Sequence, residues 1–396
     1  MEERELDDWF GLRCCYSTLS HVRFKGTHTS GKDLMDSSND TSEGKGETLR
    51  PTPRRVTFSG IQPTGIPHIG NYIGALKSWL RIQDDHHLES GREEVFYSIV
   101  GLHSLTIPRD PARLRKDRFE MMCCLLAIGL KPNRCCLFNQ DDVPAHSELA
   151  WILGCLTSVG KLNRMTTWKS KIADSKQSNS LDEVDDRSLH LGLLSYPVLQ
   201  TADILLYRST QVPVGADQEQ HIELTRSIAK SFNKKFRTNL FPLPTPILTP
   251  QAKILNLRNP IQKMSKSSPS VQSRILITDS PQGIRSKITS AVTDSIKFVT
   301  YDPINRPGIS NLLDIYRSIT GEEESMSKRF EGRMADELKS QLVDVLVEEL
   351  RPIQVEFERL QGERTAVEKV FELGAVRANA VAQNTLKEVK LKIGLL

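Results

Sequence analysis

Residues 56–71 read VTFSGIQPTGIPHIGN, which is an apolar strand, a glycine-rich turn and the beginning of a helix. Apolar residues then recur at helical spacing from Ile69 to Leu80. Where a strand leads into a helix in this way, the free N–H groups and the dipole of the helix N-terminus favour an anion. The segment matches neither the P-loop nor G-x-G-x-x-G. It therefore predicts a phosphate site that these general nucleotide motifs do not describe.

The pattern of a strand followed by a helix is repeated along the chain. Val95–Val100 has the composition of a buried strand, Leu114–Leu130 is helical, and Cys136–Phe138 is the next strand. Strands separated by helix-length connections form parallel sheets with helices on both faces. We expect an α/β fold with a Rossmann-like, doubly wound parallel sheet.

The strand patterns end after about Thr278. Apolar residues at helical spacing mark Leu338–Leu350, Pro352 can open the next helix, and Val367–Gln383 is again helical. The polar stretch 169–190 is expected to be a mobile loop. The predicted parts are a disordered N-terminal extension (1–53), a Rossmann-like catalytic domain (54–262), a loop (263–277) and an all-helical domain (278–396), whose last helix can pack back on the catalytic domain.

Composition excludes several classes of protein. The 396 residues are enough for two or three domains, and the hydrophobic and charged fractions of 38% and 26% are ordinary for globular proteins. The longest apolar run, Met121–Leu130, is far shorter than the roughly 20 residues of a membrane-spanning helix. A net charge of +4 neither requires nor excludes a polyanionic partner. Seven cysteines without C-x-x-C spacing exclude a zinc ribbon and suit reduced, buried thiols inside the cell.

A second polar segment, Lys263-Met264-Ser265-Lys266-Ser267, lies far along the chain from the first. Its lysines and hydroxyl groups can neutralise and hydrogen-bond a triphosphate while pyrophosphate leaves. On its own, a cluster of Lys and Ser is typical of a solvated loop. Together with His68-Ile69-Gly70-Asn71 on a parallel α/β fold, it indicates a nucleotide site.

These two segments resemble the HIGH and KMSKS signatures of class I aminoacyl-tRNA synthetases. Further blocks, in the same order along the chain, are similar to the bacterial and mitochondrial type of tryptophanyl-tRNA synthetase. The blocks are FSGIQPTG (58–65), NYIGAL (71–76), LSYPVLQTADILLY (194–207), VPVGADQ (212–218), HIELTR (221–226) and AVTDS (291–295). The resemblance covers about Arg55 to the C-terminus, apart from the polar stretch 169–190.

The resemblance implies roles for individual residues. The tryptophan-binding residues implied are Phe58, Gly60, His103, Gln200, Asp203, Val212, Val214 and Gln218. The ATP-binding residues implied are Gln62, Pro63, Thr64, Gly70, Asn71, Gly215, Ala216, Asp217, Ile254, Lys263, Met264, Ser265, Lys266 and Ser267. The catalytic residues implied are His68, Asn71, Lys263 and Lys266.

Asp203 matches the carboxylate that accepts the indole N–H, and such a buried acceptor separates tryptophan from apolar competitors. A structural interpretation stands beside several of these roles. Asp203 can be a helix N-cap, His103 a core histidine, and Val212 and Val214 simple core packing.

The implied activity is that of a tryptophan–tRNA ligase. ATP would activate L-tryptophan, and the adenylate would pass tryptophan to the 2′-hydroxyl of the terminal adenosine of tRNA(Trp). Mg²⁺ would be bound through the ATP phosphates, and we expect no protein metal site. A second copy of the chain is the other implied partner. The resemblance also implies that the helical domain reads the anticodon. From Leu276 onward acidic residues slightly outnumber basic ones, so tRNA contacts of this domain must come from a patterned face.

The N-terminal extension bears on location. Residues 13–25 carry basic residues and no acids, as organellar transit peptides do, whereas the first eight residues are mostly acidic, as transit peptides are not. Resemblance to mitochondrial members of the family implies the mitochondrial matrix. A cytoplasmic location is the alternative.

One position departs from the family pattern. Gly101 stands where the family commonly has Asp, so we expect a carboxylate to be lost beside the pocket and substrate affinity to be altered. Two other functions stay open. A tyrosyl-tRNA synthetase shares the fold, and a catalytically silent relative would bind only RNA or a partner protein.

Overall fold

The computed structural model describes residues 54–88, 93–165, 190–215, 218–248, 253–266, 268–321 and 327–396. A parallel sheet lies at the centre of this part of the chain, with strand order β3-β2-β1-β4-β5. The strands are β1 (Arg55–Ile61), β2 (Glu93–Ile99), β3 (Cys136–Asn139), β4 (Gln211–Val214) and β5 (Thr245–Leu248). This order confirms the predicted Rossmann-like, doubly wound sheet.

Helices connect the strands and cover the sheet. Those before β4 are α2 (Ile69–Asn71), the π-helix η1 (Tyr72–Leu76), α3 (Lys77–Leu88), α4 (Gly101–Ser104), α5 (Pro111–Ala127), the 3₁₀ turn η2 (Gln140–Asp142), α6 (Ala145–Gly154), α7 (Val159–Asn163) and α9 (Leu191–Leu206). Those after it are α10 (Glu219–Lys235), the 3₁₀ turn η5 (Val271–Ser273), α11 (Pro281–Thr289), α12 (Pro307–Thr320), α13 (Ser327–Phe330), α14 (Ala335–Gly362) and α15 (Arg364–Ile393).

The chain leaves the middle of the sheet in two directions. From β1 it steps to β2 and β3, and after returning to β4 it steps the other way to β5. Because parallel crossovers are right-handed, α3 and α5 belong to one face of the sheet and α10 to the opposite face. The order reverses between β1 and β4. Ligands of such folds bind outside the carboxyl ends of the strands at this reversal.

The predicted helix from Ile69 to Leu80 forms, but it contains a π-helical turn at η1. Beyond this turn Trp79 is buried, whereas Leu80 is only partly buried. A π-helical turn is wider than 3.6 residues, so a strict 3.6-residue pattern does not predict which side chains face the core after it. Trp79 stacks on Tyr97 of β2, with 4.3 Å between ring centroids.

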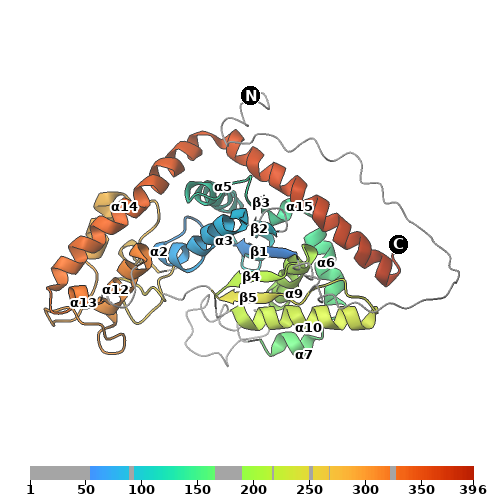
Figure 1. Ribbon diagram of the computed structural model, residues 1–396, viewed down its shortest axis with the longest axis horizontal. Helices are drawn as coiled ribbons and strands as arrows, with labels where there is room; N and C mark the ends of the chain where they lie inside the picture. Colours follow the sequence, from blue (N-terminus) through green and yellow to red (C-terminus); the bar gives the residue numbers. More distant parts are fainter. Residues whose placement is uncertain are drawn as a thin grey trace, which may run out of the picture. The chain divides into compact units, whose positions relative to one another are not determined.

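The C-terminal region is helical, as predicted, but Pro352 does not open a new helix. It lies inside α14, which runs on to Gly362. Proline has no N–H group, so the carbonyl one turn earlier in the helix loses its hydrogen-bond donor. Because Pro352 is on the exposed side of the helix, water can donate to that carbonyl instead. Figure 1 shows α14 and α15 as two long helices that follow each other directly.

Helix α15 packs against β3 at very short range. A side chain at Gly374 would collide with the carbonyl oxygen of Leu137, and the Cys136 thiol donates to the Gly374 carbonyl at 3.2 Å. Glycine at position 374 therefore allows the last helix to lie against the sheet.

Two of the predicted segments cannot be compared with the structure. The N-terminal extension (1–53) and nearly all of the polar loop (166–189) lie outside the described residues. Cys123, Cys124, Cys135 and Cys136 are buried free thiols, as predicted. Cys155 is exposed, so the prediction of buried thiols was wrong there. In the described part of the chain, no helix is both long and apolar enough to cross a membrane.

Candidate active site

A pocket of about 330 Å³ opens at the reversal of the strand order, at the carboxyl ends of β1, β2 and β4. All eight residues predicted to bind tryptophan line it. Its lining residues are Phe58, Ser59, Gly60, Ile61, Gln62, Ala75, Trp79, Val100, His103, Tyr196, Gln200, Asp203, Ile204, Val212, Pro213, Val214, Gly215 and Gln218. Sequence segments that lie far apart therefore meet in one cavity.

Asp203 lies within α9 and faces a cluster of hydrogen-bond donors. Oδ2 is 2.8 Å from Nε2 of His103, and Oδ1 is 2.7 Å from both Nε2 of Gln140 and Nδ1 of His146. Burial acts to raise the pKa of Asp203, but the hydrogen bonds from the two histidines outweigh it and hold the pKa below its ordinary value. The carboxylate is therefore ionised, and it is not an N-cap because it sits well inside the helix.

A second histidine supports the other polar residues of the pocket. The His221 side chain is buried, with Nδ1 2.8 Å from Oε1 of Gln200 and Nε2 3.2 Å from the Tyr196 hydroxyl. A carbonyl oxygen can only accept, so Nδ1 of His221 donates to Oε1 of Gln200. His221 thus orients two side chains that line the pocket.

Sequence reasoning missed Gln140, His146, Tyr196 and His221 as members of the site. Tyr196 and His221 stand within blocks that match the family. Gln140 and His146 stand in η2 and α6 without any local pattern that separates them from core residues. Only the tertiary fold brings them to Asp203 and Gln200.

Gly60 is required by its surroundings at the end of β1. A Cβ there would lie 2.7 Å from Cγ1 of Val100, the residue that follows β2. The absence of a side chain keeps the floor of the pocket open between these strands.

The His68–Asn71 segment begins the first helix with a capping box. The Asn71 N–H donates to Nδ1 of His68, and the His68 N–H donates to Oδ1 of Asn71, each at 3.2 Å. Burial, followed by the charges of Lys266, Lys263 and Arg274, lowers the pKa of His68 to about 3. The ring is therefore neutral, and because Nδ1 accepts, the hydrogen is on Nε2.

The two signature segments meet in space. Nζ of Lys266 donates to the Gly65 carbonyl at 2.6 Å and to the Thr64 hydroxyl at 3.2 Å. Burial lowers the pKa of Lys266 to about 8. The predicted ATP residues Thr64 and Lys266 are thus direct neighbours.

Backbone contacts hold the same two regions together. The Ile69 N–H donates to the Ile275 carbonyl at 2.8 Å, and the Ile277 N–H to the Pro67 carbonyl at 3.0 Å. The Met264 N–H donates to the Ile254 carbonyl at 3.0 Å. Ile254 also lies close to Gly70: a Cβ added at Gly70 would be 3.4 Å from the Cβ of Ile254.

The remaining predicted ATP residues surround these contacts or lie outside the described residues. Gln62 and Gly215 line the pocket. Pro63 is buried beside Thr64, and Ser265 is half-buried. Lys263 is exposed, but its charge is close enough to lower the pKa of His68. Ala216, Asp217 and Ser267 lie outside the described residues. In the part that is described, no cluster of His, Cys, Asp and Glu could hold a metal ion.

Gly101 begins α4, and only Val100 separates it from β2. A carboxylate from another element fills the place of its missing side chain. A Cβ at position 101 would lie 2.5 Å from Oδ1 of Asp141. Asp141 is held there by Nη1 of Arg118, 2.8 Å from its Oδ2. η2 therefore places a carboxylate at this position, and the expected change in substrate affinity stays a prediction.

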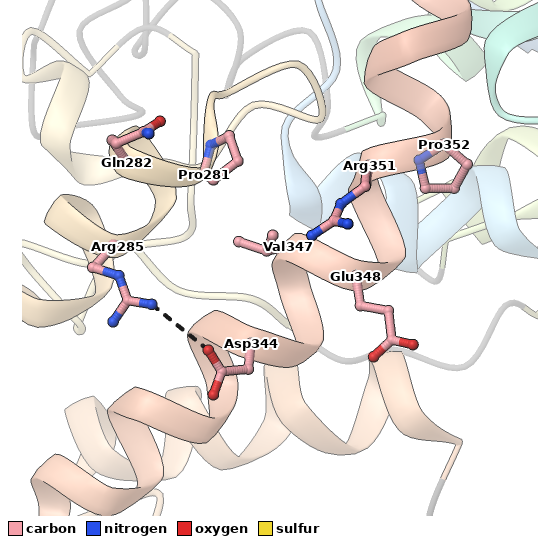
Figure 2. A pocket seen from close by; sticks show the side chains of 8 residues that line it. All are labelled: Pro281, Gln282, Arg285, Asp344, Val347, Glu348, Arg351 and Pro352. Atoms are coloured by element: carbon pink, nitrogen blue, oxygen red, sulfur yellow. Dashed lines mark ion pairs between the residues drawn. The ribbon is translucent and has the colours of Figure 1, made fainter.

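A second groove, of about 620 Å³, lies between α11 and α14 and contains none of the predicted site residues. Figure 2 shows Arg285 facing Asp344 across it, with a distance of 3.7 Å between Nη2 and Oδ1. Glu348 and Arg351 lie further along α14. The acidic side chains that line this groove are equal in number to the basic ones. The surroundings of His68 are instead rich in lysine.

Comparison with known proteins agrees with this geometry. Residues 51–350 match the profile of the family described as tRNA synthetases class I (W and Y). The mitochondrial tryptophan–tRNA ligase of Schizosaccharomyces pombe is 43% identical over 348 residues, which are 87% of this chain and 96% of that protein. The tryptophan–tRNA ligase of Caldanaerobacter subterraneus subsp. tengcongensis is 44% identical over 341 residues, covering 86% of this chain and 98% of that protein.

Solved structures give the same result. Tryptophanyl-tRNA synthetase from Mycoplasma pneumoniae matches with a TM-score of 0.72 and 31% identity, covering 86% of this chain and 98% of that one. The enzyme from Campylobacter jejuni, complexed with ADP and tryptophan, matches with a TM-score of 0.69 and 30% identity over 86% and 99% of the two chains. The chain therefore belongs to the tryptophan–tRNA ligases, within the class I tRNA synthetase family for tryptophan and tyrosine.

Proposed function

We propose that this chain activates L-tryptophan with ATP and transfers it to tRNA(Trp). The observation that carries the proposal is the 330 Å³ pocket, because it joins the predicted tryptophan residues to the first ATP residues, Gln62 and Gly215. An amino acid bound in the pocket would have its carboxylate beside the α-phosphate of ATP, which is the arrangement that an in-line attack requires.

Recognition of the indole N–H rests on one buried acceptor, the carboxylate of Asp203. Asp203 would accept the indole N–H, while Val212, Val214 and Phe58 pack against the ring. A ligand without an N–H donor at that place would leave a buried carboxylate oxygen unpaired, which disfavours it strongly.

Replacement of Asp203 by alanine tests this role. Tryptophan binding, followed by equilibrium dialysis, should weaken by roughly 10- to 100-fold, the size expected for a hydrogen bond to a charged group. Binding of ATP in the same variant should stay close to that of the unchanged protein. Unchanged discrimination between tryptophan and phenylalanine would remove Asp203 from the recognition of the indole.

The activation step needs positioning and charge stabilisation rather than a side-chain nucleophile. The tryptophan carboxylate attacks the α-phosphorus, and pyrophosphate leaves. Nε2–H of His68 and the ammonium groups of Lys263 and Lys266 would stabilise the phosphate oxygens, and Mg²⁺ would be bound through the ATP phosphates. The neutral state of His68 suits it to donate without changing its charge.

Transfer to tRNA is the second step. We infer that the 2′-hydroxyl of the terminal adenosine attacks the adenylate carbonyl and that the helical region 278–396 reads the anticodon. Aminoacylation of tRNA(Trp) transcripts with altered anticodons tests the second part. Their kcat/KM should fall while ATP–pyrophosphate exchange stays the same; equal charging of all transcripts would contradict anticodon reading.

A homodimer is the proposed assembly. His146 at the start of α6 bonds Tyr207 at the end of α9, so these helices run antiparallel. At their other end Trp151 and Leu191 are 77% and 76% exposed, and exposed apolar groups of this kind suit a protein interface. Trp151→Glu should shift the mass in sedimentation equilibrium towards the monomer, whereas Val355→Glu on α14 should not.

The mitochondrial matrix is the proposed location. Relatives from two yeasts, Schizosaccharomyces pombe and Saccharomyces cerevisiae, are named mitochondrial. A fluorescent protein fused to residues 1–53 should accumulate in mitochondria. A uniformly cytoplasmic signal would favour the alternative location.

A further inference from the structure

The acceptor positions of Asp203 are nearly all used by the protein itself. Within the described residues, Oδ1 receives hydrogen bonds from Gln140 and His146, and Oδ2 receives one from His103. A carboxylate oxygen has two lone pairs in its plane. One acceptor position, on Oδ2, is therefore left for a ligand, which matches the single N–H of an indole ring.

Both ring nitrogens of His146 have buried hydrogen-bond partners. Nδ1 must donate, because the ionised carboxylate of Asp203 can only accept. Nε2 lies 2.8 Å from the Tyr207 hydroxyl. The side chains of Tyr207, His146 and Asp203 thus form one hydrogen-bonded chain.

Gln140 connects Asp203 to α4, the helix that carries His103. Its Nε2 donates to Oδ1 of Asp203 at 2.7 Å, and its Oε1 accepts from the Leu102 N–H at 3.1 Å. Leu102 precedes His103, the donor to Oδ2. One side chain therefore sets the distance between the carboxylate and the segment that carries its other donor.

Neither Gln140 nor His146 can touch a ligand. Both side chains are fully buried, and neither lines the pocket. We propose that they are positioning residues for amino-acid discrimination: by saturating Oδ1 of Asp203 they hold the free acceptor position of Oδ2 toward the ligand N–H. This inference rests on the proposed role of Asp203 as the indole acceptor.

The physical consequence concerns ligands with and without that N–H. If one donor to Oδ1 is lost, the carboxylate can turn to find another partner, and the hydrogen bond to the indole weakens. A tryptophan isostere whose ring carries sulfur in place of N–H loses no binding energy, because it does not make this hydrogen bond in the unchanged protein either. A general loss of packing would instead weaken both ligands together.

The experiment compares L-tryptophan with β-(3-benzothienyl)-L-alanine in ATP–pyrophosphate exchange, using the ratio of their kcat/KM values. His146→Leu and Gln140→Met remove the donors, and His146→Asn keeps a donor near the place of Nδ1. Leu149→Ala, one turn along α6 in the apolar core, is the control for destabilisation. Asp203→Asn shows the effect of changing the acceptor itself.

His146→Leu and Gln140→Met should each lower the ratio by roughly 10-fold or more, and His146→Asn should restore most of it. Leu149→Ala should lower the melting temperature and leave the ratio unchanged. A changed ratio in Asp203→Asn together with unchanged ratios in both donor variants would overturn this inference alone. An unchanged ratio in Asp203→Asn would overturn the role of Asp203, and the inference with it.

Discussion

Nζ of Lys266 lies 2.6 Å from the carbonyl oxygen of Gly65, although 201 residues separate them in the sequence. Gly65 belongs to the turn between β1 and the first helix, and Lys266 to the segment Lys263–Ser267. The contact brings an ammonium group to the place where the sequence predicts phosphates. It links the glycine-rich turn before His68 to the segment that carries Lys263 and Lys266.

Replacing Lys266 by alanine should therefore affect activation far more than amino-acid binding. Removal of one preorganised charge from a transition state costs on the order of 100-fold in rate. We expect a loss of this size in the kcat of ATP–pyrophosphate exchange, with tryptophan affinity nearly unchanged in equilibrium dialysis. Equal losses in both quantities would contradict a role in the transition state.

The pKa of Lys266, lowered to about 8 by burial, predicts a pH dependence. Below pH 8 the side chain is charged in the free protein, and above it the charge is lost. The kcat/KM for ATP should be level below about pH 8 and fall above it. Lys266→Arg should move this fall to higher pH, because guanidinium stays charged. An identical profile in the arginine variant would assign the titration to another group.

The same shift has a consequence for stability. The folded pKa lies below the ordinary value of 10.5, so between about pH 8 and 10.5 the unfolded chain binds more protons at this position than the folded chain. The free energy of unfolding therefore gains a contribution as pH rises through this window. Urea titrations at pH 7.5 and 9.5 should show a smaller gain in Lys266→Ala than in the unchanged protein.

His68 serves both as a helix cap and as a donor, and two substitutions separate these roles. Asparagine is a good N-cap and keeps an acceptor for the Asn71 N–H, but it does not reach as far as Nε2. His68→Asn should lower kcat on the order of 100-fold with little change in stability. His68→Ala should in addition lower the free energy of unfolding by about 1 kcal/mol. Equal rates in His68→Asn and the unchanged protein would exclude the donor role.

Gly101 and Asp141 should behave as a coupled pair. Aspartate at position 101 would press its Cβ and a second negative charge against Oδ1 of Asp141. Gly101→Asp should lower kcat/KM for tryptophan roughly 10-fold or more, and Asp141→Ser in the same chain should recover most of the loss, as coupling energies of contacting residues allow. Purely additive losses in the double variant would show that the two positions do not share one site.

Much of the fold could be predicted from the sequence because its signals are local. Strand β1 and the glycine-rich turn after it are read directly from residues 56–71, and the strand–helix alternation specifies a parallel sheet. The π-helical turn at η1 could not be predicted, because no residue pattern separates it from an α-helix. The continuation of α14 through Pro352 depends on the exposure of that position, which only the packed structure defines.

The candidate site divides in the same way. The residues that face ligands stand in recognisable blocks, and the eight predicted for tryptophan line one pocket. The residues that hold them from behind, such as His146 and His221, are ordinary buried polar side chains in sequence. Their partners are 57 and 21 residues away along the chain, so the contacts exist only in the folded protein.

Exchange of labelled pyrophosphate into ATP, measured with each of the twenty amino acids in turn, tests the proposed activity most directly. L-tryptophan should drive exchange with the purified protein, and L-tyrosine should not. Exchange with tyrosine but not with tryptophan would contradict the assignment of the pocket, and no exchange by a folded protein that binds tRNA would show a catalytically silent relative.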